Sequence, residues 1–256
     1  NFIASRAAKG KPIGIGIMTY LGRGAGSAAV QVPDWLYANY PSTKVPCTYS
    51  GSTVNIPKYW DSTYLTKYGN FITALANHLK ANPSLMQHVE FIYIGVGKDG
   101  ETYPCDKYGT PDDRPCLRSA GLTSAIWSDT VKAITDRYRI AFQGTGKKVM
   151  LLAWPYFDAT WERQGFQQHA ILNGVGLGLA GMEYDWPNLD KRSTSFGSTA
   201  LDYTLEQAEK GYWLYNNTQY RFPVAFEGYD YMVDLANSGP RILYWAMLTA
   251  LSRHAD

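Results

Sequence analysis

Residues 89–102 read VEFIYIGVGKDGET, an apolar run that ends in a Gly-containing turn. Side chains alternate between the two faces of a strand. One face would carry aliphatic side chains and the other aromatic side chains followed by glycines: Ile92, Ile94 and Val96 against Phe91, Tyr93, Gly95 and Gly97. The aliphatic face suits packing against helices, and the glycines would leave room for a ligand. Glu101 would then stand at the carboxyl end of the strand.

Further apolar runs alternate with segments of helical periodicity. The runs span 12–20, 148–154, 177–185, 222–227 and 241–248. Two helical stripes are clear: Leu65, Tyr68, Ile72, Leu75 and Leu79 after a cap at Asp61 or Ser62, and Trp127, Val131, Ile134, Tyr138 and Phe142 before Gly144. Weaker helices are expected at 160–172 and 201–216, and a long loop after the first run carries VPDWL at 32–36. This alternation predicts βα units and a parallel sheet.

The length of 256 residues fits one α/β barrel, a fold that typically uses about 250. Six strands are visible rather than eight, and residues 1–10 read as the end of a helix that feeds the first run. We therefore expect a single domain over residues 1–256, a TIM-type (β/α)8 barrel that lacks its first two βα units in this chain. An open six-stranded α/β sheet is the structural alternative.

The run FPVAFE at 222–227 ends in a second acidic residue. Alternation directs Val224 and Phe226 toward the helices, and it directs Glu227 toward the barrel axis at the mouth, where active barrels carry their chemistry. A buried carboxylate is costly unless it is used or paired. Glu227 could instead pair with an arginine, and Glu101 could be a solvated loop acid beside Lys98 and Asp99.

The chain is rich in aromatic residues, with 20 Tyr and 8 Trp, and many follow the apolar runs. Sugars present flat C–H faces that pack on aromatic rings, although Tyr and Trp also fill large cores. Aromatic and acidic residues near the strand ends are the candidate substrate contacts: Tyr20, Trp154, Glu183, Asp185, Trp186, Tyr229 and Trp245. Glu183 could alternatively be catalytic itself.

The order of these motifs resembles clan A glycoside hydrolases, especially the β-galactosidase-like barrels. The resemblance rests on the PDWL loop, the helix WDSTYLTKYGNFITALANHL and the strand end IGVGKDGE, and it covers residues 10–251. In that clan an acid/base Glu ends the fourth strand and a nucleophilic Glu ends the seventh, which implies these roles for Glu101 and Glu227. Trp245 would lie in the eighth strand. The clan usually has Asn before the acid/base Glu to bind the sugar 2-hydroxyl, whereas this chain has Gly100.

The resemblance implies retaining hydrolysis of a β-linked oligo- or polysaccharide, with the two carboxyl groups about 5–5.5 Å apart. That mechanism requires no metal and no organic cofactor, and the four His show no zinc-site spacing. The net charge of +2 favours neither a nucleic acid nor an anionic membrane as partner. No apolar stretch approaches the roughly 18 residues of a membrane span. The sequence leaves the oligomeric state open.

The three cysteines and the first residue bear on the compartment. Cys105 and Cys116 bracket a polar loop and could form a disulfide, but spacing leaves free thiols equally open. The chain begins at Asn1 rather than Met, as after removal of a leader or in a truncated chain. With a carbohydrate substrate, we expect a secreted or extracellular protein.

Two other functional classes fit the same residues. A non-catalytic carbohydrate-binding barrel would keep the aromatic cleft without a working acid, and Gly100 favours it. A structural or assembly protein could reuse the barrel, because an open sheet edge is prone to association.

Overall fold

The computed structural model describes residues 2–10, 12–107, 111–153, 156–182, 224–228 and 244. The helices are α1 (Phe2–Ala7), α2 (Asp34–Asn39), α3 (Ser62–Lys80), α4 (Pro83–Met86), α5 (Arg114–Ser119), α6 (Ser124–Ala141) and α7 (Thr160–Leu172), with short 3-10 turns at Arg23–Ala28 and Pro41–Thr43. The strands are β1 (Ile13–Gly16), β2 (Lys44–Tyr49), β3 (Ser52–Pro57), β4 (Val89–Ile94), β5 (Lys148–Leu152), β6 (Gly176–Met182) and β7 (Val224–Gly228).

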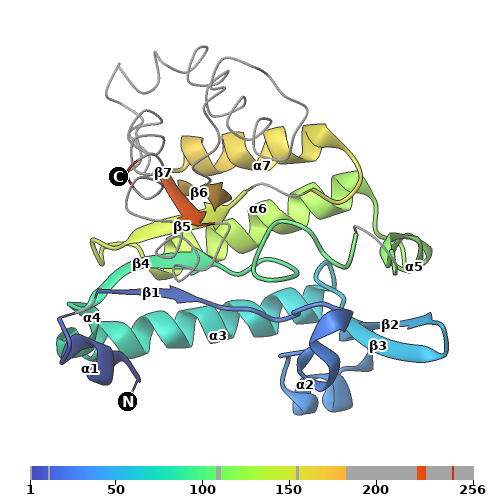
Figure 1. Ribbon diagram of the computed structural model, residues 1–256, viewed down its shortest axis with the longest axis horizontal. Helices are drawn as coiled ribbons and strands as arrows, with labels where there is room; N and C mark the ends of the chain where they lie inside the picture. Colours follow the sequence, from blue (N-terminus) through green and yellow to red (C-terminus); the bar gives the residue numbers. More distant parts are fainter. Residues whose placement is uncertain are drawn as a thin grey trace.

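Five strands form one parallel sheet in the order β1-β4-β5-β6-β7. Each corresponds to one of the predicted apolar runs. The helices α3, α6 and α7 lie side by side along the sheet (Figure 1). The run at 241–248 lies outside the described residues apart from Tyr244. The predicted parallel α/β architecture is therefore confirmed, and closure of the sheet into a barrel stays a prediction.

The helices begin and pack as their sequence periodicity predicts. The Asp61 carboxylate caps α3 by accepting hydrogen bonds from the amides of Thr63 at 2.9 Å and Tyr64 at 3.0 Å. All five residues of the α6 stripe are buried: Trp127, Val131, Ile134, Tyr138 and Phe142. The predicted helix at 160–172 matches α7, and α1 precedes β1 as expected.

The two faces of β4 differ as the alternation predicts. Ile92, Ile94 and Val96 are fully buried in the core against the helices. Phe91 and Tyr93 are half-buried and form an edge-to-face pair with ring centroids 4.7 Å apart. These rings need small neighbours: a Cβ at Gly14 would collide with the Phe91 ring, and one at Gly178 would come within 3.3 Å of the Tyr93 ring.

The glycines that follow β4 do not leave room for a ligand, so that expectation was wrong. A Cβ on Gly95 would collide with the carbonyl oxygen of Ile17, and one on Gly97 would collide with the carbonyl oxygen of Tyr103. The space beside both glycines is occupied by neighbouring backbone. They are required for close packing of the chain at the end of the strand.

A β-hairpin interrupts the region that the sequence suggests is a loop. β2 and β3 pair antiparallel, with Lys44 opposite Pro57 and Tyr49 opposite Ser52. Ser50 and Gly51 between them have φ of 48° and 78°, as expected for a tight two-residue hairpin turn. The alternating residues Val45 and Cys47 are buried.

The disulfide joins this hairpin to α5, which corrects the suggested Cys105–Cys116 pairing. Cys116 is bonded to Cys47, with the two Cα atoms 5.8 Å apart. Cys105 is a buried free thiol. Because Cys47 lies in a strand that the apolar pattern did not reveal, its proximity to Cys116 was not visible from spacing.

Candidate active site

Glu101 is carried by a tight turn after β4. Asp99 and Gly100, the central residues of this turn, have φ of 55° and 80°. The Glu101 amide donates to the carbonyl of Lys98 at 2.9 Å, and the Gly97 amide donates to the carbonyl of Glu101 at 2.8 Å. Positive φ at both central residues is the geometry of a type I′ turn, for which Asp-Gly is a preferred sequence. Gly100 therefore meets a backbone requirement of this turn.

Neighbouring strands hold the segment around Glu101 in place. The Thr102 hydroxyl donates to the carbonyl of Leu152 at the end of β5, at 3.2 Å. The indole N–H of Trp127 on α6 donates to the carbonyl of Thr102 at 3.0 Å. The Asp99 amide donates to the carbonyl of Tyr20 after β1, at 2.8 Å. Glu101 itself is half-buried, and the bonds of its neighbours Asp99 and Thr102 connect this segment to the segment after β1, to β5 and to α6.

The end of β4 is also held from beneath by a closed set of three hydrogen bonds. The Tyr68 hydroxyl donates to the Gly95 carbonyl at 2.7 Å, and the Gly95 amide donates to the Tyr138 oxygen at 3.3 Å. The two hydroxyls lie 2.9 Å apart, and because the Tyr68 hydrogen is already used, Tyr138 is the donor between them. This Gly95 ring, made of Gly95, Tyr68 and Tyr138, is buried and satisfies every polar atom in it.

A compact charged cluster lies beside Glu101. Lys98 forms an ion pair with Asp99 and lies 3.9 Å from Asp106. The Tyr103 hydroxyl is 3.1 Å from both the Lys98 ammonium and the Asp99 carboxylate. Burial raises the pKa of Tyr103, and the charges of Asp99 and Glu101 raise it further. Tyr103 is therefore a neutral hydrogen-bonding group next to the Glu101 carboxylate.

Tyr20, predicted to contact substrate, is fully buried instead of exposed. Its hydroxyl donates to Asp106 at 3.0 Å, and the Arg23 amide donates to the same carboxylate oxygen at 2.8 Å. Burial raises the pKa of Tyr20, and Asp106 adds to that shift. The Arg23 guanidinium in turn donates hydrogen bonds of 2.8–3.1 Å to the Asp113 carboxylate. Tyr20 thus acts on the cluster by positioning Asp106.

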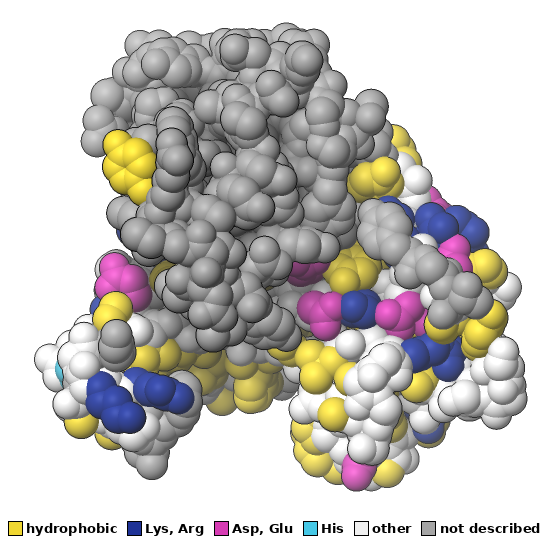
Figure 2. Space-filling model, in the orientation of Figure 1, with side chains coloured by type: hydrophobic (Ala, Val, Ile, Leu, Met, Phe, Trp, Pro, Cys, Tyr) yellow, Lys and Arg dark blue, Asp and Glu magenta, His cyan; other side chains and the backbone are white. Residues whose placement is uncertain are grey.

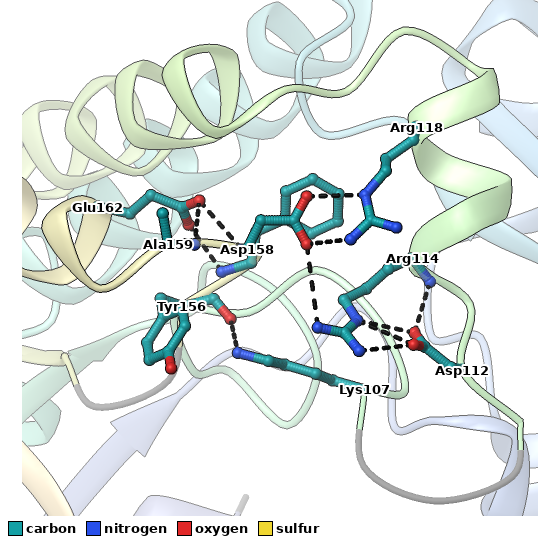
Figure 3. Close-up of polar contacts among 9 residues, drawn as sticks. Lys107, Asp112, Arg114, Arg118, Tyr156, Asp158, Ala159 and Glu162 are labelled. Atoms are coloured by element: carbon teal, nitrogen blue, oxygen red, sulfur yellow. Dashed lines mark hydrogen bonds and ion pairs between the residues drawn. The ribbon is translucent and has the colours of Figure 1, made fainter.

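Lys107 continues this set of polar groups toward the end of β5. Its ammonium donates to the carbonyl of Tyr156 at 2.6 Å and lies 3.5 Å from the centre of that ring (Figure 3). The side chain is almost completely buried, and this burial lowers the pKa of Lys107 to about 8. A proton on Lys107 is therefore more easily lost than on an ordinary lysine.

Next to Lys107, a set of ion pairs fixes the approach to α7 (Figure 3). Arg118 binds Asp158 with contacts of 2.5 and 2.8 Å, and Arg114 binds Asp112 with contacts of 2.6–3.0 Å. The fully buried Glu162 accepts from the amides of Phe157, Asp158 and Ala159, at 2.7, 3.0 and 3.0 Å. Because all these bonds satisfy backbone at a helix start, Glu162 is structural.

The second predicted carboxylate, Glu227, is the penultimate residue of β7 and lies in register with Ala180 of β6. Its backbone is thus at the carboxyl end of the same parallel sheet that carries Glu101. Its side chain lies outside what the structure describes. The other predicted contacts are also outside the described residues: Trp154, Glu183, Asp185, Trp186, Tyr229 and Trp245.

The sequence interpretation missed the groups around Asp106, Lys107 and Arg23. They occupy the polar segments after β4 and β1, where the apolar pattern gives no signal. Position after a strand end was the available clue, since the carboxyl ends of parallel strands share one edge of a sheet. Among the described residues, no group of three or more His, Cys, Asp or Glu could hold a metal ion. In the same part of the chain, no helix has the length and apolar character needed to cross a membrane.

The fold is shared with a solved structure, the catalytic domain of beta-amylase from Paenibacillus polymyxa, with a TM-score of 0.58 and 13% sequence identity. The match covers 89% of this chain and 72% of that chain. At this identity the likeness shows the fold alone, an α/β arrangement of the TIM-barrel type. Comparison of the sequence with protein-family models and with curated proteins found no match.

Proposed function

We propose that this protein is a retaining glycoside hydrolase acting on a β-linked oligo- or polysaccharide, with Glu101 as acid/base and Glu227 as nucleophile. The observation that carries the proposal is the position of the two glutamates. One follows β4 and the other nearly ends β7, at the same edge of one parallel sheet. The fold shared with a beta-amylase catalytic domain supports it. The resemblance to β-galactosidase-like barrels supplies the assignment of roles.

In this mechanism, the Glu227 carboxylate attacks the anomeric carbon while Glu101 protonates the leaving glycosidic oxygen. A covalent glycosyl-enzyme forms and the aglycone departs. Glu101, now ionised, then takes a proton from water as the water oxygen attacks the anomeric carbon, which releases the sugar and restores Glu227. Carboxyl groups about 5–5.5 Å apart are required. All steps use side chains of this chain.

The surrounding groups would orient the sugar. Tyr103 and Lys98 lie beside Glu101 and offer a hydroxyl and an ammonium to sugar oxygens, and Tyr20 would act through Asp106. The remaining proposed contacts are Trp154, Glu183, Asp185, Trp186, Tyr229 and Trp245. Stacking on Trp and hydrogen bonds to carboxylates together suit a polyhydroxylated ring.

The test is hydrolysis of 4-nitrophenyl β-glycosides of galactose, glucose, mannose and xylose. We expect turnover by the wild type, loss in Glu227→Gln, and a fall of about 10²–10⁴-fold in Glu101→Gln on substrates with poor leaving groups. Asp129→Asn is the matched control, because that carboxylate is 81% exposed on α6. Proton NMR of the first product should show retained configuration. Turnover that survives Glu227→Gln, or cleavage of substrates with poor leaving groups that survives Glu101→Gln, would refute the assignment.

A non-catalytic carbohydrate-binding barrel is the second candidate. It is favoured by Gly100, which replaces the Asn that usually precedes the acid/base Glu in the resembled clan. That protein would bind β-linked oligosaccharides without cleaving them, and Glu101→Gln would leave its affinity nearly unchanged.

We also propose a secreted or extracellular location, supported by the Cys47–Cys116 bond. Disulfides persist in oxidising compartments and are rare in a reducing cytosol. Peptide mapping of the purified, unreduced protein should recover Cys47 linked to Cys116 and Cys105 as a free thiol. Recovery of all three cysteines as thiols from protein kept under air would remove this support.

A further inference from the structure

An apolar groove of about 220 Å³ lies between the segment after β1, the start of α2 and the first half of α3. Three large side chains in its lining are unusually exposed: Met18 at 50%, Trp35 at 53% and Phe71 at 48%. Gln31 and Lys67 add polar groups to the lining. Hydrophobic side chains are visible along a hollow between α1 and α2 in Figure 2. Exposed large apolar side chains gathered in one concave surface mark a binding site more often than scattered ones do.

The groove adjoins the turn that carries Glu101. A Cβ at Gly100 would lie 3.7 Å from Met18 Cγ and 3.6 Å from the Ile17 carbonyl oxygen, and both residues also line the groove. The Asp99 amide is bonded to the next residues of the same segment, at the Tyr20 carbonyl. Residues 17–19 therefore line the groove, and the same segment borders the Glu101 turn through Ile17, Met18 and Tyr20.

The base of the groove holds polar atoms that lack partners. Thr19 and Tyr64 line it, and their hydroxyls are buried without a hydrogen-bond partner within the described part of the chain, as is the hydroxyl of Tyr59 behind them. Burial raises the pKa of both phenols and nearby Thr19 offsets only part of that rise, and none of the three hydroxyls forms a bond of good geometry. Unsatisfied buried hydroxyls are unfavourable. Each of these oxygens is enclosed by neighbouring side chains, so a ligand oxygen would reach it only when one of those side chains moves aside.

We propose that this groove is an additional sugar subsite, in which one ring of an oligosaccharide packs its C–H face on Trp35 and Phe71 while its neighbours extend past Met18 toward Glu101. The inference rests on the proposed glycosidase site and extends it to a chain-like substrate. The chemistry favours a sugar, because the flat aromatic surface of Trp35 and Phe71 is combined with the polar side chains of Gln31 and Lys67. The volume suits a single ring, since pockets for larger ligands are typically about 300–1,000 Å³.

Direct binding of cellohexaose, β-1,4-galactohexaose and β-1,4-mannohexaose, measured by calorimetry on the full chain carrying Glu227→Gln so that the ligand is not cleaved, tests the groove without depending on catalysis. We expect Trp35→Ala to weaken the affinity for the preferred hexasaccharide by about tenfold. Phe71→Ser should act in the same direction and covers the case in which Trp35→Ala fails to fold. Trp161→Ala is the matched control, because Trp161 is equally exposed, at 49%, but lies on α7.

Kinetics then separate the subsite from the active site. Trp35→Ala should raise KM for the hexasaccharide about tenfold and leave kcat/KM for the 4-nitrophenyl monosaccharide unchanged. Equal hexasaccharide affinity in wild type and Trp35→Ala, with aryl glycosides still cleaved, would overturn the subsite and leave the hydrolase standing. Trp35-dependent binding without any cleavage would support the groove as a sugar site while refuting the hydrolase. A wild-type dimer that Trp35→Ala converts to monomer would assign the groove to self-association and overturn the proposal.

Discussion

Replacing Tyr138 with Phe tests whether the Gly95 ring holds the end of β4. The substitution removes the Tyr138 hydroxyl and keeps the aromatic side chain, which is fully buried beneath the sheet. The Gly95 amide then loses its acceptor, now 3.3 Å away, while Tyr68 keeps its 2.7 Å bond to the Gly95 carbonyl. A buried donor left without a partner costs about 1–3 kcal/mol. We expect Tyr138→Phe to lower the free energy of unfolding by that amount.

Urea denaturation followed by far-ultraviolet circular dichroism measures this difference, with the slope checked for constancy between variants. Tyr49→Phe is the control, because Tyr49 is 40% exposed on the hairpin, and we expect a change within about 0.5 kcal/mol. Tyr68→Phe should cost at least as much as Tyr138→Phe, since it leaves the Gly95 carbonyl dependent on a rotated Tyr138 hydroxyl. If Tyr138→Phe were as stable as Tyr49→Phe, the hydrogen bonds of the Gly95 ring would contribute nothing to the free energy of unfolding, and the reasoning would be refuted.

Three further results are expected. Gly97→Ala should destabilise the fold by more than about 2 kcal/mol in thermal unfolding, because its Cβ collides with the Tyr103 carbonyl oxygen; stability close to wild type would contradict this packing. Gly100→Asn should cost only about 1 kcal/mol in the same assay, because nothing lies closer than 3.6 Å to its Cβ and Asn tolerates positive φ, whereas Gly100→Val should cost clearly more. Stability should fall between about pH 10 and 12, because burial raises the pKa of Tyr138 to about 12 and the unfolded chain therefore loses this proton first; denaturation midpoints measured across this range check the sign.

The periodic elements were predictable because one physical pattern fixes each of them. The stripes of α3 and α6 repeat every three to four residues, so the buried face follows from the sequence. The alternation in VEFIYI likewise places Ile92 and Ile94 against the helices, and both are fully buried. The hairpin at 44–57 was not predicted because Pro46 and several polar residues interrupt the alternation of apolar and polar side chains. Its Ser50-Gly51 turn was the signal that could have revealed it.

The glycines after β4 show why local pattern fails where backbone meets backbone. A glycine in a strand end is equally compatible with a nearby ligand and with a close approach of the chain. Gly95 and Gly97 proved to be the second kind, against Ile17 and Tyr103. The residue that packs against such a glycine lies far away in the sequence or in a segment without a periodic pattern, so only the three-dimensional structure identifies it. The disulfide is a similar case, because Cys47 reaches Cys116 through a hairpin that spacing did not indicate.

Gly100 can now be interpreted in terms of backbone conformation. With Asp99 it forms a turn in which both residues have positive φ, a conformation that Gly adopts freely and most residues avoid. Gly is the residue that fits this turn best, although Asn also tolerates it, so the presence of Gly100 does not by itself indicate a lost activity. A neighbouring side chain would have to bind the sugar hydroxyl in place of Asn. Tyr103 and Lys98 are the candidates, since both are held beside Glu101. If Tyr103 makes this contact, Tyr103→Phe should lower kcat/KM for glycosides that carry a 2-hydroxyl and leave kcat/KM for 2-deoxy glycosides unchanged. An equal effect on both kinds of glycoside would show that Tyr103 does not bind the 2-hydroxyl.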